Sequence, residues 1–322
     1  MKESPDGPVI TDVLDAKVPD GALTEGRIVN ASLVEDVLSE TLRVIQPRGA
    51  HIVTTAGPGG RDVMLYRRRI NRASRAEARR SLPNLPSLGF PNKEKMVMDL
   101  VIHDPEGIGP EMDVLLVAAH RDRIKARQEL FRDVGIEVDT VEVDLCALHN
   151  LANHVGLVPE NDGSLVVHLH IGAASAQIAV AVDGKLALGR RVVSTGMAAL
   201  TTAVQESGRI GSEDPLVAVT QEDSNGMFDD LIEHWAQTVS EDVMQSVGQV
   251  ESTDEAQGQI VLSGAGSMVP NIARVLASAS GMDVDLLDPF SALTVETELP
   301  AETRRAGPIY ALAAAYALRG LS

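Results

Sequence analysis

The alternation of strand-length apolar runs with helix-length amphipathic segments is the feature that most restricts the fold of this chain. One apolar run of strand length begins at Leu165 ("LVVHLHI"), and another begins at Gln259 ("QIVLSGAG"). Between them, residues 229–247 carry apolar side chains at every third or fourth position, which is the period of a helix with one buried face. Helices that pack on sheets in this order form α/β domains. The sequence therefore predicts an α/β fold.

Length and charge narrow the class of protein further. The 322 residues exceed what one compact core usually holds, so we expect two lobes. The 46 acidic and 28 basic residues give a net charge of -18, which opposes binding to nucleic acid. Cys146 is the only cysteine, so an intramolecular disulfide and a cysteine-built metal cage are excluded. The N-terminal "MKESPDGPVI" is unlike a secretory signal, and no run approaches the ~20 apolar residues of a membrane span, so any membrane contact is expected to be peripheral.

The first half of the chain reads as one lobe interrupted by an insertion. The pattern predicts a strand at 9–16, a helix at 32–44 and a strand at 50–55 that ends in the turn "AGPGG". From residue 61 the character changes to a strand, an arginine-dense segment, the Pro/Gly-rich "SLPNLPSLGFPN" and three further elements, including the helix "RDRIKARQELFRDVG". The predicted organisation is a first lobe at 1–60, an inserted α/β subdomain at 61–136, a return to the first lobe at 137–160, a second lobe at 161–305 and a terminal helix at 306–322.

The second lobe begins after the linker "ENDG" with two strands joined by short loops of small residues. Asp183 and Gly184 stand between apolar alternations, which is a strong signal for a β-hairpin. Trp235 falls on the apolar face of the helix at 229–247, so we interpret it as a core anchor. Further on, Gly264, Ala265 and Gly266 form a Gly-x-Gly turn between a strand and a helix.

Such a turn lets a backbone approach a ligand, but taken alone it is a weak signal. A dinucleotide-binding fingerprint would require a third small residue where Val269 stands. A tight strand-to-helix turn that binds nothing remains the simplest alternative. The sequence also has no Walker A pattern, no His-Glu-x-x-His zinc helix and no Gly-x-Ser-x-Gly nucleophile elbow.

The order of several motifs carries a resemblance that none of them carries alone. "IGAAS" with its following hairpin, "VVSTGM" before a helix, "VLSGAGSMVPNI" and a small-residue terminal helix occur in the order of the actin-like ATPase superfamily, which the chain resembles. Within it, "VPDGALTEGRIVN", "DVLLVAAHRDRI", "FRDVGIEVDTVEVDLCAL" and "LLDPF" resemble segments of the PilM family of type IV pilus assembly proteins, relatives of FtsA. The resemblance implies two RNase H-like lobes around a nucleotide cleft, with the inserted subdomain on the first lobe.

The resemblance also implies a set of nucleotide contacts, although two parts of the family's site differ here. The first phosphate hairpin would precede Val9 and is expected to be absent, and the Asp-Ile-Gly that ends the family's strand is replaced by His170-Ile171-Gly172. A neutral imidazole is a poor partner for Mg²⁺, so we expect no efficient ATP hydrolysis, no catalytic residue, and weak or absent binding of ATP with Mg²⁺. The candidate nucleotide contacts are His170, Gly172, Ala173, Ser175, Gly196, Gly264, Ala265 and Gly266.

His168 and His170 lie two residues apart on one predicted strand and therefore share a face. A His-x-His transition-metal site is one interpretation, but no third ligand is identifiable nearby. The alternative is that His168 fills a polar gap in the interior and His170 sits in an emptied phosphate site.

The arginine-dense segment stands out in an otherwise acidic chain. A local basic patch attracts anionic lipid head groups or an acidic partner segment, because screening limits the reach of distant charges to ~8 to 10 Å. The alternative is a solvated strand end and helix face on which Glu77 is paired locally. The arginines concerned are Arg67, Arg68, Arg69, Arg72, Arg75, Arg79 and Arg80.

Taken together, the resemblance implies a non-catalytic cytoplasmic scaffold of a type IV pilus or related secretion assembly. Its expected partners are the N-terminal cytoplasmic tail of a PilN-like bitopic membrane protein and other pilus assembly components, and the partner would hold it at the inner membrane. We expect the tail to dock between the strand ending at Thr54 and Thr55 and the strand at 113–120, as an extended peptide that borrows backbone hydrogen bonds. An active actin-like ATPase or sugar-type kinase with a mis-assigned start is the alternative.

Overall fold

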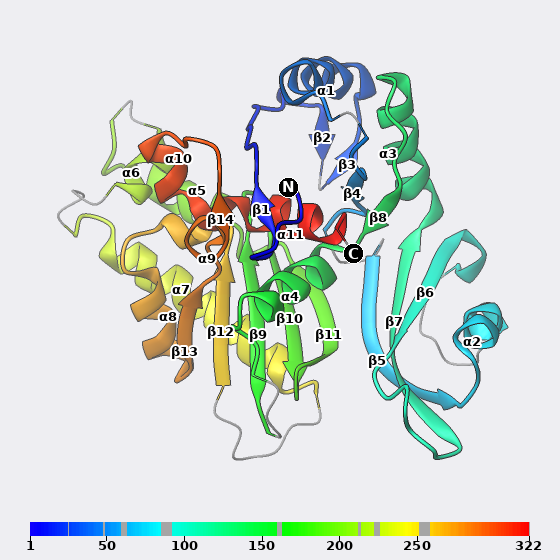
Figure 1. Cartoon of the computed structure of the whole chain (residues 1–322). Helices are drawn as coiled ribbons and strands as arrows, with labels where there is room; N and C mark the ends of the chain where they lie inside the picture. The colour runs from blue at the N-terminus through cyan, green and yellow to red at the C-terminus, as the bar shows by residue number, and fades with distance from the viewer. Residues whose placement is uncertain are drawn as a thin grey trace. The chain divides into compact units, whose positions relative to one another are not determined.

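The computed structural model confirms the α/β fold and divides the chain into two compact units (Figure 1). It describes residues 1–24, 26–47, 49–58, 63–84, 92–159, 163–211, 214–221, 226–250 and 258–321. Unit 1 contains Met1–Ala147, Val295–Glu298 and Tyr316–Ser322, and unit 2 contains Leu148–Thr294 and Leu299–Ala315. The last two glycines of "AGPGG", most of the Pro/Gly-rich segment and most of the "ENDG" linker lie outside the described residues.

Unit 2 is built on a sheet with the strand order β13-β12-β9-β10-β11. β9 and β12 run parallel, and β10 pairs with antiparallel neighbours on both sides. The predicted hairpin joins β10 to β11 through Asp183 (φ 53°) and Gly184 (φ 69°), the two positive φ angles that a type I′ turn requires. The strands are β9 (Leu165–Ile171), β10 (Ala176–Val182), β11 (Lys185–Val192), β12 (Gly258–Ser263) and β13 (Asp283–Leu286).

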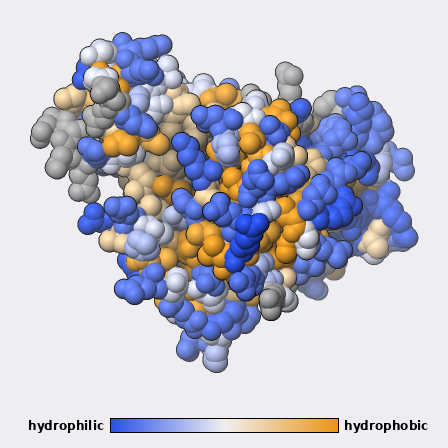
Figure 2. All heavy atoms as spheres, turned by 90° about the horizontal axis from the view of Figure 1, so that it is seen from above, coloured by the Kyte–Doolittle hydropathy of each residue, from blue (hydrophilic) through white to orange (hydrophobic). Residues whose placement is uncertain are grey.

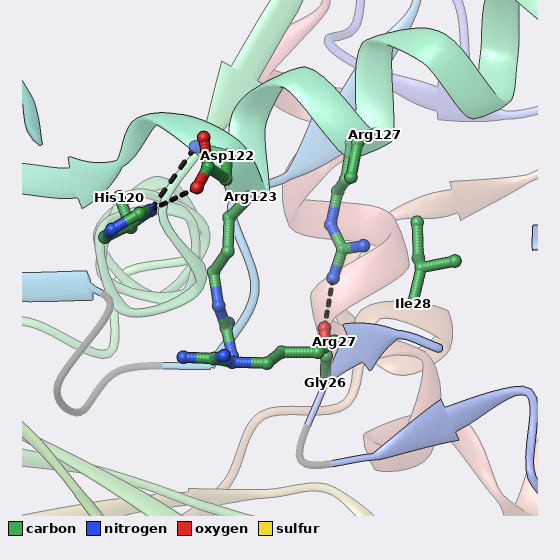
Figure 3. Close-up of a pocket in the computed structure, with 8 residues that line it drawn as sticks. Gly26, Arg27, Ile28, His120, Asp122, Arg123 and Arg127 are labelled. Carbon is green, nitrogen blue, oxygen red and sulfur yellow. Dashed lines mark hydrogen bonds and ion pairs between the residues drawn. The ribbon is translucent and has the colours of Figure 1, made fainter. Parts of the chain in front are cut away.

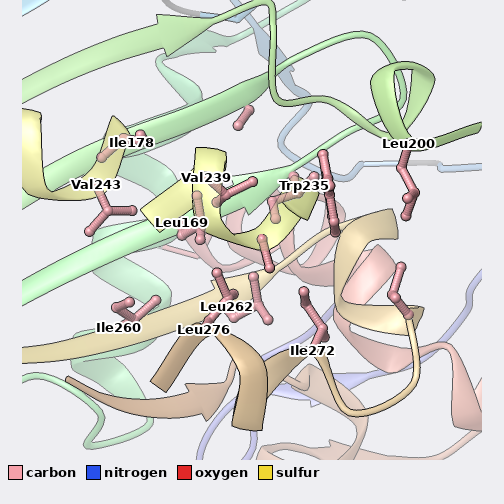
Figure 4. Packing of buried hydrophobic residues seen from close by; sticks show 14 of the residues in the cluster. Leu169, Ile178, Leu200, Trp235, Val239, Val243, Ile260, Leu262, Ile272 and Leu276 are labelled. Atoms are coloured by element: carbon pink, nitrogen blue, oxygen red, sulfur yellow. The ribbon is translucent and has the colours of Figure 1, made fainter. Parts of the chain in front are cut away.

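Helices of unit 2 bury their apolar faces against this sheet (Figure 4). Trp235 is 5% exposed within that core, which confirms its role as a core anchor. Leu169, Ile178 and Leu262 supply the sheet side of the same cluster. The helices are α5 (Met197–Glu206), α6 (Pro215–Thr220), α7 (Asp229–Val247), α8 (Ile272–Ser280), α9 (Pro289–Ala292) and α10 (Ala301–Arg305), with short 3₁₀ turns η3 (Ala265–Met268) and η4 (Gly307–Tyr310).

The first-lobe segments of unit 1 contain less regular structure than the sequence predicted. The strand expected at 9–16 is reduced to Val9–Ile10, because no strand of the described ranges pairs with residues 11–16. The strand expected at 50–55 is reduced to β4 (Val53–Thr55). The predicted helix is confirmed as α1 (Ala31–Ile45), although none of its residues is fully buried. The remaining elements of these segments are β1 (Val9–Ile10), β2 (Leu23–Thr24), β3 (Arg27–Ile28) and β8 (Thr140–Glu142). Three further elements belong partly to unit 1 and partly to unit 2: α4 (Asp144–His154), β14 (Thr294–Val295) and α11 (Ala311–Arg319).

The segment predicted as an inserted subdomain contributes three antiparallel strands to unit 1, in the order β5-β7-β6. Its core contains Leu100, Val114 and Leu116 from the strands, and Ala78 and Leu82 pack on them from one side. Its elements are β5 (Val63–Asn71), α2 (Arg75–Ser81), the 3₁₀ turns η1 (Leu82–Asn84) and η2 (Lys93–Lys95), β6 (Met96–Ile102), β7 (Glu111–His120) and α3 (Arg121–Asp133).

Across the described ranges, every helix is too short or too polar to cross a bilayer.

Candidate functional site

Carbonyl groups of the loop between β9 and β10 accept hydrogen bonds from the first amides of α5. The amides of Met197 and Ala198 donate to the carbonyls of Gly172 (3.0 Å) and Ala173 (2.8 Å), and the amide of Gly172 donates to the carbonyl of Ser175 (3.0 Å). The first amides of a helix are the donors that an anion normally takes. A phosphate at this helix end would therefore have to displace two existing hydrogen bonds.

Gly196 and Ser175 form the other contact between this loop and α5. A Cβ atom at position 196 would lie 2.5 Å from the carbonyl carbon of Ala174, so only glycine permits the approach. Ser175 is buried, and its hydroxyl accepts a hydrogen bond from Nε of Arg191 at 2.8 Å. The sequence reasoning missed Arg191, because an arginine on an antiparallel strand carries no local signal of a contact across the sheet.

His170 links the β9 loop to the Gly-x-Gly turn. Its Nδ1 atom lies 3.0 Å from Oγ of Ser263 at the end of β12, and the side chain is 8% exposed. Gly264 follows with a φ of +85°, and a Cβ atom there would lie 2.5 Å from the carbonyl oxygen of Ile171 and 2.9 Å from Cε1 of His170. The imidazole is thus held between two backbone segments rather than projecting into open space.

Gly266 is explained by packing within the same unit. A Cβ atom at this position would lie 2.5 Å from Cβ of Ile171, so the turn at Ala265 and Gly266 rests directly on β9. The structure accordingly brings all eight predicted nucleotide contacts together in unit 2. It also gives Gly196, Gly264 and Gly266 a packing reason that requires no ligand.

His168 belongs to a different buried pair. Its Nε2 atom lies 2.9 Å from Nδ1 of His149, and Nε2 of His149 lies 3.1 Å from the carbonyl of Gly184. A carbonyl only accepts, so Nε2 of His149 carries a proton, its Nδ1 accepts, and His168 donates from Nε2. Nδ1 of His168 is then an acceptor, and it has no hydrogen-bond partner among the described residues.

This arrangement keeps His168 neutral. Burial, and then the neighbouring His149, lower the pKa of His168 well below 6.5. No cluster of three or more metal-ligating side chains occurs in the described ranges, so the His-x-His metal interpretation gains no third ligand there. His168 fills a polar position in the interior of the protein.

A buried polar cluster in unit 1 was not predicted. Asp144 is 4% exposed, and its Oδ1 atom accepts hydrogen bonds from the hydroxyls of Thr55 and of Tyr316, the latter at 2.6 Å. The amide of Gly57 donates to Thr55 Oγ1 at 2.6 Å. Burial and the adjacent Asp144 raise the pKa of Tyr316 well above 10. These residues are far apart in the sequence, so no local pattern could have grouped them.

The arginine-dense segment is divided between structural and exposed side chains. Nε of Arg67 donates to both carboxylate oxygens of Asp113, at 2.8 and 2.7 Å, and Arg72 pairs with Asp104 at 2.6 Å. Glu77 closes a capping box with Ser74, which confirms the predicted local pairing of this acid. The remaining arginines, Arg68, Arg69, Arg75, Arg79 and Arg80, are exposed.

The expected docking groove requires one correction. β7 (Glu111–His120) pairs with β5 on one side and with β6 on the other, so its backbone groups are already used. β4 differs, because β8 is its one paired neighbour among the strands of the described ranges. Ile52 and Ala56 point their backbone groups toward β8, so Val53 and Thr55 present theirs to the opposite edge.

A further pocket of about 300 Å³ lies between α3 and the β2–β3 segment of unit 1 (Figure 3). Its lining includes Arg27, Arg123 and Arg127, which the sequence reasoning did not group. The four-residue spacing of Arg123 and Arg127 indicates that they share a helix face, but nothing in the sequence links them to the distant Arg27.

Comparison with known proteins places these features in a family. A family model described as "Type IV pilus assembly protein PilM" matches residues 2–321. A chain of a solved "PilM-PilN type IV pilus biogenesis complex" is similar, with a TM-score of 0.77 and 20% identity over 94% of this chain and 89% of that chain. No curated protein matches the sequence.

Two more distant solved structures share the fold. The ethanolamine utilization protein EutJ from Carboxydothermus hydrogenoformans has a TM-score of 0.52 and 12% identity, over 92% of this chain and 77% of that chain. MreB5 of Spiroplasma citri bound to ADP has a TM-score of 0.53 and 10% identity, over 91% and 76%. These likenesses show the actin-like two-lobe fold that the sequence predicted.

Proposed function

Because the chain belongs to the family of the type IV pilus assembly protein PilM, we propose that it is a non-catalytic scaffold of a type IV pilus or related secretion assembly. The family match over residues 2–321 is the observation that carries this proposal. Other assembly components and an anionic-lipid contact through the exposed arginines between Arg67 and Arg80 are further expected interactions.

The proposed partner is the N-terminal cytoplasmic tail of a PilN-like bitopic membrane protein. The similar solved structure is a PilM-PilN complex, which supports a partner of this kind. The open edge of β4 suits an extended peptide, because Val53 and Thr55 offer backbone groups that β8 does not use. Such binding would hold the protein on the cytoplasmic face of the inner membrane.

The absence of catalysis is proposed from the chemistry at His170. The MreB5 structures are named for bound ADP and AMPPNP, so nucleotide binding occurs on this fold. Here an imidazole stands where the family's strand carries an acid, and it contacts Ser263 rather than offering a carboxylate for Mg²⁺. The second candidate is an active ATPase or sugar-type kinase, favoured by the convergence of eight predicted contact residues.

Peptide binding tests the scaffold proposal directly. A fluorescent peptide with the N-terminal sequence of the neighbouring gene's single-span membrane protein is titrated into the full-length protein, with anisotropy as the readout. We expect micromolar-range affinity, roughly 8 kcal/mol, that persists without nucleotide or Mg²⁺.

Two variants locate the contact. Val53→Pro removes an amide on the open edge of β4, and we expect at least tenfold weaker binding with the fold retained. Ile108→Ala changes a fully exposed side chain of the inserted subdomain and should bind like the parent protein. Equal binding by Val53→Pro would place the peptide elsewhere, and no binding by the parent protein would remove the proposed partner.

A further inference from the structure

Three arginines from two separate segments line one pocket of unit 1. Arg27 belongs to β3, whereas Arg123 and Arg127 lie one helical turn apart on α3. In Figure 3, the side chains of Arg123 and Arg127 extend from α3 toward the β2–β3 segment. The guanidinium group stays protonated at any physiological pH, so the pocket gathers three permanent positive charges. The rest of the lining is Gly26, Ile28, His120, Asp122 and Ala126.

Gly57 makes room for two of these guanidinium groups. A Cβ atom at position 57 would lie 2.5 Å from Nη1 of Arg123 and 3.3 Å from Nη2 of Arg127. The φ angle of Gly57 is +98°, a backbone conformation that other residues rarely adopt. The two like charges therefore converge beside a backbone segment that has no side chain to separate them.

The lining of the pocket contains few acidic groups. Asp122 is the one acidic residue in that lining, and its side chain is 85% exposed and lies 3.7 Å from Nδ1 of His120. Nη2 of Arg127 donates to the carbonyl of Gly26 at 2.7 Å, which is a neutral acceptor. Within the described part of the chain, Arg127 forms no ion pair, and its buried Nε atom has no hydrogen-bond partner.

The pKa of Arg127 reflects the charged groups around it. Burial, and then the positive charge of Arg123, lower the pKa of Arg127, while Asp144 and Tyr316 act in the opposite direction. Repulsion between two guanidinium groups is relieved when an anion binds between them. In Figure 2, hydrophilic residues dominate the right-hand edge of the visible face.

We propose that this pocket, referred to below as the arginine pocket, binds an oxyanion: a phosphate or carboxylate group of a ligand that enters from solvent. Guanidinium groups donate paired, charge-assisted hydrogen bonds to both kinds of group. A volume of about 300 Å³ accommodates a small molecule or a peptide side chain that carries such an anion. The inference depends neither on the proposed scaffold function nor on nucleotide binding in unit 2.

Nuclear magnetic resonance of the arginine Nε–Hε groups tests the proposal on the full-length protein. Inorganic phosphate and sodium acetate are titrated separately, and sodium chloride at equal ionic strength serves as the reference. We expect saturable shifts of the resonances of Arg27 and Arg127, assigned from the variants below, with phosphate, acetate or both but not with chloride. The anion that saturates identifies which chemistry the pocket prefers.

Three variants show whether the arginine pocket is the site. Arg127→Gln and Arg27→Gln should each weaken anion binding by about tenfold, as expected for the loss of a charge-assisted contact. Arg27 is exposed, so its variant keeps the fold even if Arg127→Gln does not. Arg80→Gln removes an exposed arginine on α2 and should leave the affinity unchanged. Unsaturable shifts with both anions, or parent affinity in Arg27→Gln, would overturn the proposal.

Discussion

The loop around His170 in unit 2 and the arginine pocket in unit 1 use their polar groups in opposite ways. In unit 2, the amides of Met197 and Ala198 already donate to carbonyls of the β9–β10 loop, and His170 contacts Ser263. In the arginine pocket, one exposed acid stands among three guanidinium groups. The polar groups of a motif that resembles a ligand site can therefore form their hydrogen bonds within the protein itself. A site that no motif indicates can gather several like charges from segments that are distant in the sequence.

The largest effect is expected from filling the Gly-x-Gly turn. Gly264→Ala places a Cβ atom 2.5 Å from a backbone oxygen at a φ of +85°, so we expect a loss of ~3 to 4 kcal/mol in the free energy of unfolding. Gly281→Ala is the matched control, because it has a similar φ of +73° but nothing within 4 Å, and should cost ~1 kcal/mol. Urea unfolding measures both. Equal losses would show that close packing does not require glycine at position 264. The Gly-x-Gly turn would then no longer be explained by packing alone, as the comparison with the arginine pocket assumes.

The second-largest loss of stability is expected from a change in the buried cluster around Asp144. Tyr316→Phe removes a hydroxyl donor to a carboxylate that is 4% exposed, so we expect a loss of ~2 kcal/mol by urea unfolding. Ser81→Ala is the control, because its hydroxyl donates to a single carbonyl near a helix end and should cost less than 1 kcal/mol. Similar values for both variants would show that Asp144 does not depend on Tyr316.

Acid should destabilise the protein through His168 before the carboxylates titrate. The pKa of His168 is lowered in the folded state, so the unfolded chain binds more protons below pH 6.5. Stability from this group is fully present above pH 6.5 and falls by ~1.4 kcal/mol for each pH unit below it.

One histidine variant tests that assignment. In His168→Gln, the slope of the unfolding free energy between pH 6.5 and 5 should decrease by an amount that corresponds to about one bound proton. An unchanged slope in His168→Gln would mean that another group causes the acid sensitivity.

The smallest effect is expected from nucleotide. ATP with Mg²⁺ should give no turnover above background and little thermal stabilisation, because the loop amides are occupied and position 170 lacks a carboxylate. The same measurement is made on Arg127→Gln, because ATP phosphates that bind at the proposed arginine pocket would also stabilise the parent protein. Mg²⁺-dependent stabilisation in both proteins would revive a nucleotide site in unit 2, and turnover would favour the enzyme.

The sequence by itself determined the α/β class, the helix at 229–247, the hairpin at Asp183 and Gly184, and the family resemblance. These follow from periodicity, turn chemistry and motif order, all of which act over short stretches of chain. The strands predicted at 9–16 and 50–55 were too long, because a strand forms only where a neighbouring strand supplies hydrogen-bond partners, and the sequence does not show that neighbour.

Only the tertiary structure decided what the individual polar groups contact. His168 meets His149, Asp144 meets Tyr316, and Arg27 shares a pocket with Arg127, each through chain folding over long sequence distances. The free energy of a buried hydrogen bond or charge depends on its neighbours in space, and those neighbours are set by the packing of the whole unit. Spatial neighbours also explain the glycines: Gly264 and Gly266 pack closely against residues of β9, and the sequence alone does not distinguish such a packing role from a role in binding a ligand.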